Sequence, residues 1–292
     1  MMRTGYGDAA ASAGDYSMRI SLHHLAITET TPSELVDIAA ALGCDHVCLF
    51  VKIPAEQAAA FPYVFPRVES LEAARELKSR LDGLGLSVWN VDTFMIQPGV
   101  KIEDYRETLE IAALLGARTI NSLNLFPADA TAAAAQTLGS FSKLAAQTGL
   151  TVVLEWFRYS STTTLGAAVE LIRLADEPNI RLNVDVLHLL RNGGRPADLA
   201  DVDASLIQYA QISDGPLDQP ESAQADEALF NRNFPGEGEF PLVSFVRHLP
   251  PDAVLSIEAP VNRLRSVLSP MQRAARAVAG ARAVLAAAGE RL

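Results

Sequence analysis

The sequence predicts an α/β protein with a (β/α)8 TIM barrel as its single domain. Strand-like and helix-like segments alternate eight times, without a linker or a change of composition between units. The strand-like segments are rich in Val, Ile and Leu on both faces, which is typical of parallel strands covered by helices. A length of about 270 residues is ordinary for eight such units. We therefore expect the barrel at residues 18–292, after a flexible N-terminal extension at residues 1–17.

Local signals support the individual elements. Thr31 is a suitable N-cap, Pro32 suits the first turn of the helix that follows, and Gly43 suits its C-terminal end. The expected elements, in order, are a strand at 18–27, a helix at 31–42, a strand at 45–51, a helix at 68–85, a strand at 86–94, a helix at 102–116, a strand at 117–126, a helix at 131–149, a strand at 150–157, a helix at 165–176, a strand at 180–188, a weaker helix near 196–205, a strand at 206–213, a short helix near 241–248, a strand at 253–259 and a last helix at about 270–288.

The closest alternative fold is an open, doubly wound sheet. That fold favours a glycine-rich phosphate loop after the first strand, and HHLAITETTP contains none. A long irregular stretch at 214–239 separates the seventh strand from its helix. Loops of this length are often functional, so we expect it to cover a site at the C-terminal face of the barrel, and a disordered insertion is the alternative.

Composition excludes several classes of function. The chain has 49% hydrophobic and 20% charged residues, which suits a globular protein. A formal net charge of −11 and an isoelectric point near 4.9 argue against a nucleic-acid partner. No apolar run approaches the roughly 20 residues that span a bilayer, so we expect no membrane partner.

The cysteines and the N-terminus predict a cytoplasmic protein. The first residues are small and polar, without the continuous apolar segment of a secretory signal. Cys44 and Cys48 are too few for a disulfide scaffold. Cys44, His46 and Cys48 alternate and would share one face of a strand, which resembles metal-ligand spacing. We favour two buried thiols and a structural histidine there.

Four consecutive strands carry an acceptor residue at or near their C-terminal ends. These residues are Glu155, Asp185, Gln211 and Glu258. Buried strands rarely tolerate a carboxylate unless it is paired or binds a metal. The C-terminal ends of barrel strands meet around one mouth, so we expect the four side chains to converge on one divalent cation.

The donor set indicates which metal and which substrate to expect. All four groups offer oxygen, which favours Mn²⁺ or Mg²⁺ over softer ions, with Co²⁺ or Zn²⁺ as alternatives. Four protein ligands leave room for two adjacent oxygens of a hydroxy-ketone or diol. Trp156 lies beside Glu155 and is a candidate for stacking on a sugar ring, although packing in the core explains it equally well.

At these residues the chain resembles the xylose isomerase-like TIM-barrel superfamily, in its sugar phosphate isomerase/epimerase branch. The segments that carry the resemblance are LEW (154–156), NVDVLH (183–188), QISD (211–214), PGEGEF (235–240) and SIEAP (256–260). The resemblance implies that Glu155, Asp185 and Glu258 bind one divalent metal. Gln211 departs from the family, which usually has His there. His188 and Arg232 match positions that contact the substrate.

The implied reaction is proton transfer next to a carbonyl through an enediolate, in a sugar or a sugar-like keto compound. Glu155 and Glu258 are the predicted catalytic pair, one taking a proton and the other returning one. The resemblance also implies a small carbohydrate-like substrate and is compatible with a homo-oligomer.

Three alternatives stay in view. A metal-dependent dehydratase, or lyase, of the same superfamily would have the same site. A non-catalytic sugar-binding barrel would keep the fold without the reaction. Abasic-site endonucleases of the superfamily use more histidines and a basic face, and five histidines in an acidic chain argue against that class.

Overall fold

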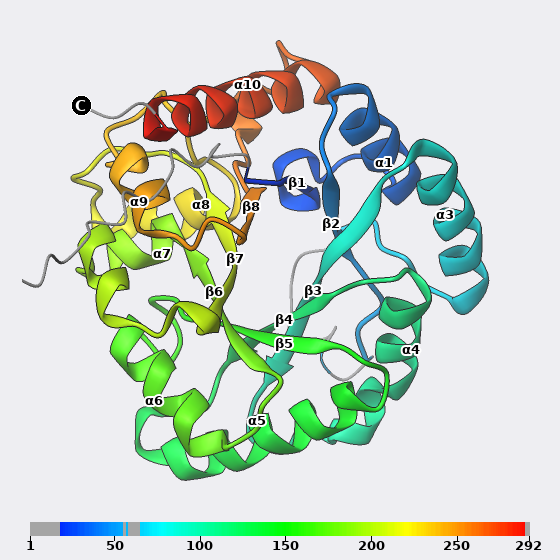
Figure 1. The fold of residues 1–292 in the computed structure, drawn as a ribbon, viewed down its shortest axis with the longest axis vertical. Coiled ribbons are helices and arrows are strands. Elements are labelled where there is room, and N and C mark those ends of the chain that lie inside the picture. Colours follow the sequence, from blue (N-terminus) through cyan, green and yellow to red (C-terminus); the bar gives the residue numbers. More distant parts are fainter. Residues whose placement is uncertain (1–17, 55–56, 58–64, 290–292) are drawn as a thin grey trace, which may run out of the picture.

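In the computed structural model, eight parallel strands form a closed barrel in the order of the chain (Figure 1). The structure describes residues 18–54, 57 and 65–289, so the predicted extension at 1–17 lies outside the described residues. β1 pairs with both β2 and β8, which closes the ring. The predicted (β/α)8 fold is confirmed.

Strands and helices alternate as expected, except that α7 directly follows β6 and the predicted helix near 196–205 is replaced by two 3-10 helices, Pro196–Asp201 and Ala204–Leu206. The strands are β1 Ile20–His23, β2 His46–Phe50, β3 Ser87–Ile96, β4 Thr119–Asn124, β5 Thr151–Glu155, β6 Ile180–Asp185, β7 Ile207–Ile212 and β8 Val254–Ile257. The α-helices in the described part of the chain are α1 Pro32–Ala41, α3 Leu71–Leu84, α4 Arg106–Leu114, α5 Thr131–Ala146, α6 Leu165–Ala175, α7 Val186–Arg191, α8 Gln224–Leu229, α9 Leu242–His248 and α10 Pro270–Gly289. No helix among the residues that the structure describes is both long and apolar enough to cross a bilayer.

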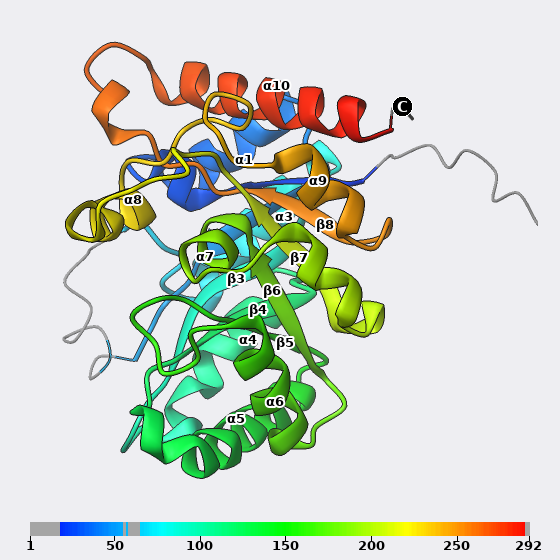
Figure 2. The same ribbon diagram turned by 90° about the vertical axis from the view of Figure 1, so that its left-hand side faces the viewer.

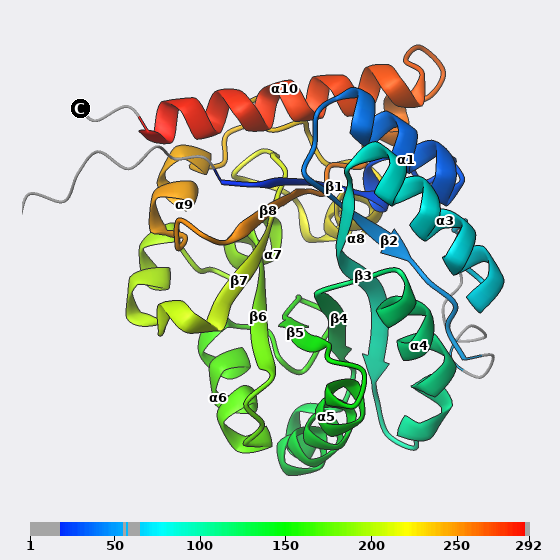
Figure 3. The same ribbon diagram turned by 45° about the vertical axis from the view of Figure 1, so that its right-hand side comes forward.

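The helices form an outer ring around the strands (Figure 3). The main apolar core fills the space between this ring and the outward faces of the strands. A second, small core of Val153, Tyr209 and Val254 lies inside the barrel, packed against Trp89. Val153 and Tyr209 precede Glu155 and Gln211 by two residues, so they share their inward face one layer deeper. The interior is therefore apolar at the bottom and polar toward the C-terminal ends of the strands.

Two predicted strands run three residues or more past the observed C-terminal end, and each error concerns the site. β1 ends at His23, because the chain turns into a 3-10 helix at His24–Ile27, and the His23 side chain accepts the Leu25 N–H. β6 ends at Asp185, whose carboxylate accepts the Leu187 N–H and begins α7. The predicted strands at 18–27 and 180–188 are wrong over their last residues, since a side-chain cap ends each of them.

The long connection after β7 is more regular than predicted. It contains α8, and its second half is fixed by the buried carboxylate of Asp214. Asp214 Oδ1 accepts the N–H groups of Gly215 and Phe240 at 2.8 and 3.0 Å, and Oδ2 accepts the N–H of Gly236 at 2.9 Å. Figure 2 shows α8 at the far side of the barrel from the end of α10. The Asp214 carboxylate thus ties the end of the connection, at Gly236 and Phe240, to its beginning at Gly215.

Candidate functional site

A cavity of about 390 Å³ opens at the C-terminal ends of the strands. Charged and polar side chains occupy its deep part, including Asp92, Glu155, His188, Arg232 and Glu258. The remaining wall is largely apolar, formed by Leu25, Phe50, Phe65, Met95, Leu123, Leu125, Phe157, Ala225, Ala228 and Leu229. We call this space the mouth cavity. The last three residues come from α8 and its end, so the long connection covers the site as expected.

The four predicted acceptor residues lie around the adjoining ends of β5 to β8. Glu155 ends β5, Asp185 ends β6, Gln211 lies in β7 and Glu258 follows β8 directly. Strand pairing sets Asp185 level with Gln211, and all four side chains are buried. Barrel geometry thus gathers them into one region, as the sequence predicts.

Glu155, Asp185 and His188 form the closest group of metal-ligand types in this region. Their ligand atoms all lie within 4.8 Å of one another. His188 Nε2 is 3.6 Å from Glu155 Oε1 and 3.9 Å from Asp185 Oδ2. His188, predicted as a substrate contact, therefore lies close enough to two predicted ligands to share a cation with them.

Arg232 lies between two of the predicted ligands. Its Nη1 donates to Asp185 Oδ2 at 2.8 Å and is 3.4 Å from Glu258 Oε2. The side chain is only 2% exposed, so water screens these contacts poorly. Although burial opposes ionisation of Asp185, the Arg232 charge lowers the pKa of that carboxyl. The guanidinium therefore holds Asp185 ionised and places its donors at the floor of the cavity.

The amide oxygen of Gln211, predicted to bind the metal, is occupied by a hydrogen bond within the barrel. Its Oε1 accepts a hydrogen bond from Asn183 Nδ2 at 2.8 Å, and its Nε2 is buried with no hydrogen-bond partner among the described residues. Asn183 Nδ2 is also 3.2 Å from Asn121 Oδ1, and Asn121 Nδ2 donates to Glu155 Oε2 at 2.5 Å. The two ends of an amide are interchangeable in shape, so Gln211 offers oxygen to a cation only with this chain of amides reversed.

The charges of the site leave room for a divalent cation. Four buried carboxyl groups, those of Asp92, Glu155, Asp185 and Glu258, face the guanidinium of Arg232 and the imidazole of His23. Even with His23 protonated, full ionisation leaves two negative charges uncompensated. Glu258 Oε2 also lacks a hydrogen-bond partner among the residues described. Oxygen and nitrogen donors, a carboxylate oxygen without a hydrogen bond and this charge balance fit a divalent metal ion.

Burial and mutual repulsion make the two glutamates weak acids. Burial raises the pKa of Glu155 well above its ordinary value, and the charges of Glu258 and Asp185 raise it further. Burial likewise raises the pKa of Glu258, to about 7, although Arg232 and His23 oppose the change. Burial lowers the pKa of His188 to about 4, so its imidazole is neutral at pH 7.

The raised pKa of Glu258 predicts how the metal-free protein responds to pH. The folded state keeps a proton on Glu258 up to about pH 7, whereas the unfolded chain releases it near pH 4.5, so stability falls as pH rises between these values. From pH 6 to pH 8, wild type should lose about 1 kcal/mol of unfolding free energy relative to Glu258→Gln. Urea titrations at both pH values measure this difference, and Mn²⁺ should abolish it. An unchanged difference between wild type and Glu258→Gln at the two pH values would show that Glu258 is ionised throughout this range.

The structure places Trp156 apart from the other predicted substrate contacts. Trp156 is 1% exposed and lines a separate groove beside α6, whereas its neighbour Phe157 lines the mouth cavity. Cys44, His46 and Cys48, which alternate in the sequence, do not form one metal-ligand group, because Cys48 groups with His23 and Asp92.

His23, Asp92 and Asn121 are the residues of the site that the sequence reasoning missed. The strand-end rule does not find the first two, because the predicted strand at 18–27 hides the end of β1 and because Asp92 lies inside β3.

Comparisons with known proteins agree with this fold. The chain belongs to the xylose isomerase-like TIM-barrel family, whose model matches residues 36–284. It is 27% identical over 242 residues to the 3-dehydroshikimate dehydratase of Pseudomonas aeruginosa, a match that covers 78% of this chain and 35% of that protein. The chain therefore spans about a third of the length of this curated relative.

Solved structures show the same barrel. An L-ribulose 3-epimerase superposes with a TM-score of 0.71 at 18% identity, covering 93% of this chain and 95% of that one. The IOLI protein with a bound zinc atom superposes with a TM-score of 0.72 at 15% identity, covering 93% and 98%. At these identities the likeness concerns the fold. The similar proteins nonetheless include both an epimerase and a dehydratase.

Proposed function

We propose that this protein is a divalent-metal-dependent enzyme that removes a proton from the carbon next to a ketone of a small hydroxylated substrate. The observation that carries the proposal is the pair of buried glutamates, Glu155 and Glu258, at the floor of one cavity beside a group of metal-ligand types. Carboxyl groups with raised pKa values suit proton transfer near neutral pH. Glu170 differs from both, because it is an exposed carboxylate that pairs with Arg173 on the surface.

Glu155, Asp185 and His188 would hold the metal, with Glu258 as a further predicted ligand, while the amide of Gln211 stays bonded to Asn183. When bound, a divalent cation would polarise the ketone and favour the enolate. Arg232 supplies a fixed positive charge at the same floor, because its Nη1 is held by Asp185. Asn121 orients Glu155 through its 2.5 Å hydrogen bond.

Glu155 and Glu258 would each carry out one of the two proton transfers of the reaction. One of them takes the proton from carbon, and the other, in its acid form, gives a proton to the substrate. If that second proton goes to carbon, the product is an epimer or an isomer. If it goes to a hydroxyl on the next carbon, the C–O bond breaks, a C=C bond forms and water leaves. Both outcomes balance without any redox partner.

Two observations favour dehydration, which was the runner-up from sequence. The curated relative is a dehydratase, and ten of the residues that line the mouth cavity are apolar, including Phe50, Phe65 and Phe157. An open-chain sugar carries hydroxyls along its whole length, and these would lack partners against such a wall. A compact ring with one polar edge fits better. Epimerisation of a sugar stays the second candidate, supported by the epimerase-like barrel.

Incubation of the metal-loaded protein with 3-dehydroshikimate and with L-ribulose tests the proposal. In deuterated solvent we expect Mn²⁺-dependent loss of water from the first compound, or deuterium incorporation next to the ketone of the second. Glu170→Gln should keep this activity, and a chelator should abolish it. Equal turnover with and without chelator, or no exchange and no water loss from either compound, would contradict the proposal.

A further inference from the structure

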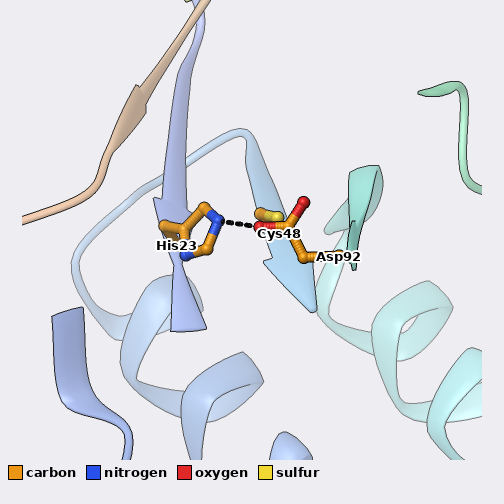
Figure 4. Close-up of side chains that lie close together, drawn as sticks. All are labelled: His23, Cys48 and Asp92. Atoms are coloured by element: carbon orange, nitrogen blue, oxygen red, sulfur yellow. Dashed lines mark hydrogen bonds and ion pairs between the residues drawn. The ribbon is translucent and has the colours of Figure 1, made fainter. Parts of the chain in front are cut away.

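The barrel mouth has a second group of metal-ligand types, which comes from the opposite side of the strand ring. His23 ends β1, Cys48 lies in β2 and Asp92 in β3, and their ligand atoms lie within 4.8 Å of one another. Figure 4 shows the His23 ring pointing at Asp92, with the Cys48 sulfur beside the carboxylate. These residue types suit zinc, so their hydrogen bonds must decide what the group does.

The hydrogen bonds of His23 show that its Nε2–H, and not a nitrogen lone pair, faces Cys48 and Asp92. The Leu25 N–H donates to His23 Nδ1 at 3.0 Å, so Nδ1 carries the lone pair in the neutral ring and Nε2 carries the proton. Nε2 lies 2.7 Å from Asp92 Oδ2 and donates to it. Burial opposes a second proton, yet the carboxyl groups of Glu258 and Asp92 help to raise the pKa of His23. Nε2 is protonated in both forms.

The other two members are held by hydrogen bonds from the side chain of Asn90. Asn90 Nδ2 is 3.4 Å from Cys48 Sγ and donates to Asp92 Oδ1 at 2.9 Å. Burial raises the pKa of the Cys48 thiol to about 11, so the sulfur is a thiol and not the thiolate that binds zinc. The group is therefore a buried carboxylate held by one donor on each oxygen.

Asp92 is the member of this group that reaches the mouth cavity. It lines the cavity beside Phe50, Phe65 and Met95, so it is a carboxyl group in a largely apolar wall. Two donors leave about two of its four lone-pair sites unused. His23 Nε2 is also 3.7 Å from Glu258 Oε1, which places Asp92 one side chain away from a proposed proton-transfer group.

We propose that Asp92 binds a substrate hydroxyl from the β1–β3 side of the cavity, and that His23 and Asn90 hold it in place. The inference rests on the proposed function, because it assigns a hydroxylated substrate to the same cavity. A buried carboxylate accepts a hydroxyl hydrogen and discriminates against a ligand that lacks it. Asp92 is a binding residue, and His23 is a positioning residue.

A first test needs no turnover. The ¹⁵N NMR signals of His23 should show a proton on Nε2 from pH 5 to pH 9. Zinc titration of the metal-free protein should give the same stoichiometry for wild type and Cys48→Ser. A wild type that binds one more zinc ion than Cys48→Ser, or a His23 with an unprotonated Nε2, would overturn the proposal in favour of a second metal site.

A second test measures recognition of the hydroxyl. For whichever of 3-dehydroshikimate and L-ribulose the metal-loaded wild type converts, kcat/KM is compared with that of its single-deoxy analogues. Asp92→Ala should lose about 10–100-fold toward the parent compound and far less toward one of the analogues. His23→Gln, which keeps a donor, should stay near wild type, while His23→Leu should follow Asp92→Ala. Equal losses on the parent and on every analogue would overturn the proposal.

The same comparison separates this inference from the proposed function. If the wild type converts neither compound, the proposed function fails, and dissociation constants for the same compounds replace kcat/KM. A selective loss of parent binding in Asp92→Ala would then still support the hydroxyl site. Absence of any binding to wild type would overturn it as well.

Discussion

Replacement of Glu155 by glutamine should lower turnover of the metal-loaded protein by about a thousandfold, within the range for loss of a positioned acid or base. The substitution removes a proton-transfer group and a charged metal ligand while keeping the size of the side chain. Glu258→Gln should cause a loss of similar size. Steady-state kinetics on the active panel compound measures both, with Glu170→Gln as the control.

The two variants should also separate the roles of the glutamates. The one that removes the base should stop exchange of the substrate proton with deuterated solvent. The other should allow exchange while blocking the product. Retention of more than a tenth of wild-type turnover by both variants, at full metal occupancy, would contradict the assigned catalytic pair.

Substitution of Arg232 by methionine should cost about 3–5 kcal/mol of unfolding free energy at pH 8, because removal of one partner leaves buried charge uncompensated. Arg232 is 2% exposed, and its Nη1 faces both Asp185 and Glu258. Urea unfolding of the metal-free protein measures the loss, and Arg173→Met, on an exposed helix face, should stay within about 0.5 kcal/mol.

Metal and pH should both reduce this loss. A divalent cation replaces part of the missing positive charge, and protonation of Glu258 below about pH 7 removes part of the negative charge. Arg232→Lys should keep the charge but lose the Nε donation to Ala228 O, so its effect should be intermediate. Equal stability of Arg232→Met and wild type at pH 8 would show that Asp185 and Glu258 are not both charged.

The C-terminal half of the site could be predicted because barrel geometry alone brings it together. Glu155, Asp185 and Glu258 are carboxylates in apolar runs, and the ends of parallel strands meet whatever the sequence between them. The orientation of Gln211 could not be predicted in this way. It depends on Asn183, one strand away, and on a register shift between Leu182 and Asn183 that no repeat in the sequence reports.

The N-terminal half was missed for related reasons. His23 stands in an apolar run that predicts one strand through residue 27, and this prediction hides its place at a strand end. Asp92 lies inside a predicted strand, and the pairing of β3 with β4 shifts between Val91 and Phe94. Such a shift changes which side chains face inward, so alternation alone does not place Asp92 in the cavity.

Anomalous scattering from crystals grown with Mn²⁺ tests the central claim most directly. We expect one manganese ion per chain, within coordination distance of Glu155 and Asp185 and at the floor of the mouth cavity, with Glu155→Gln crystals losing most of that signal. An unchanged Arg232 ion pair with no manganese peak near these carboxylates, at saturating metal, would contradict it.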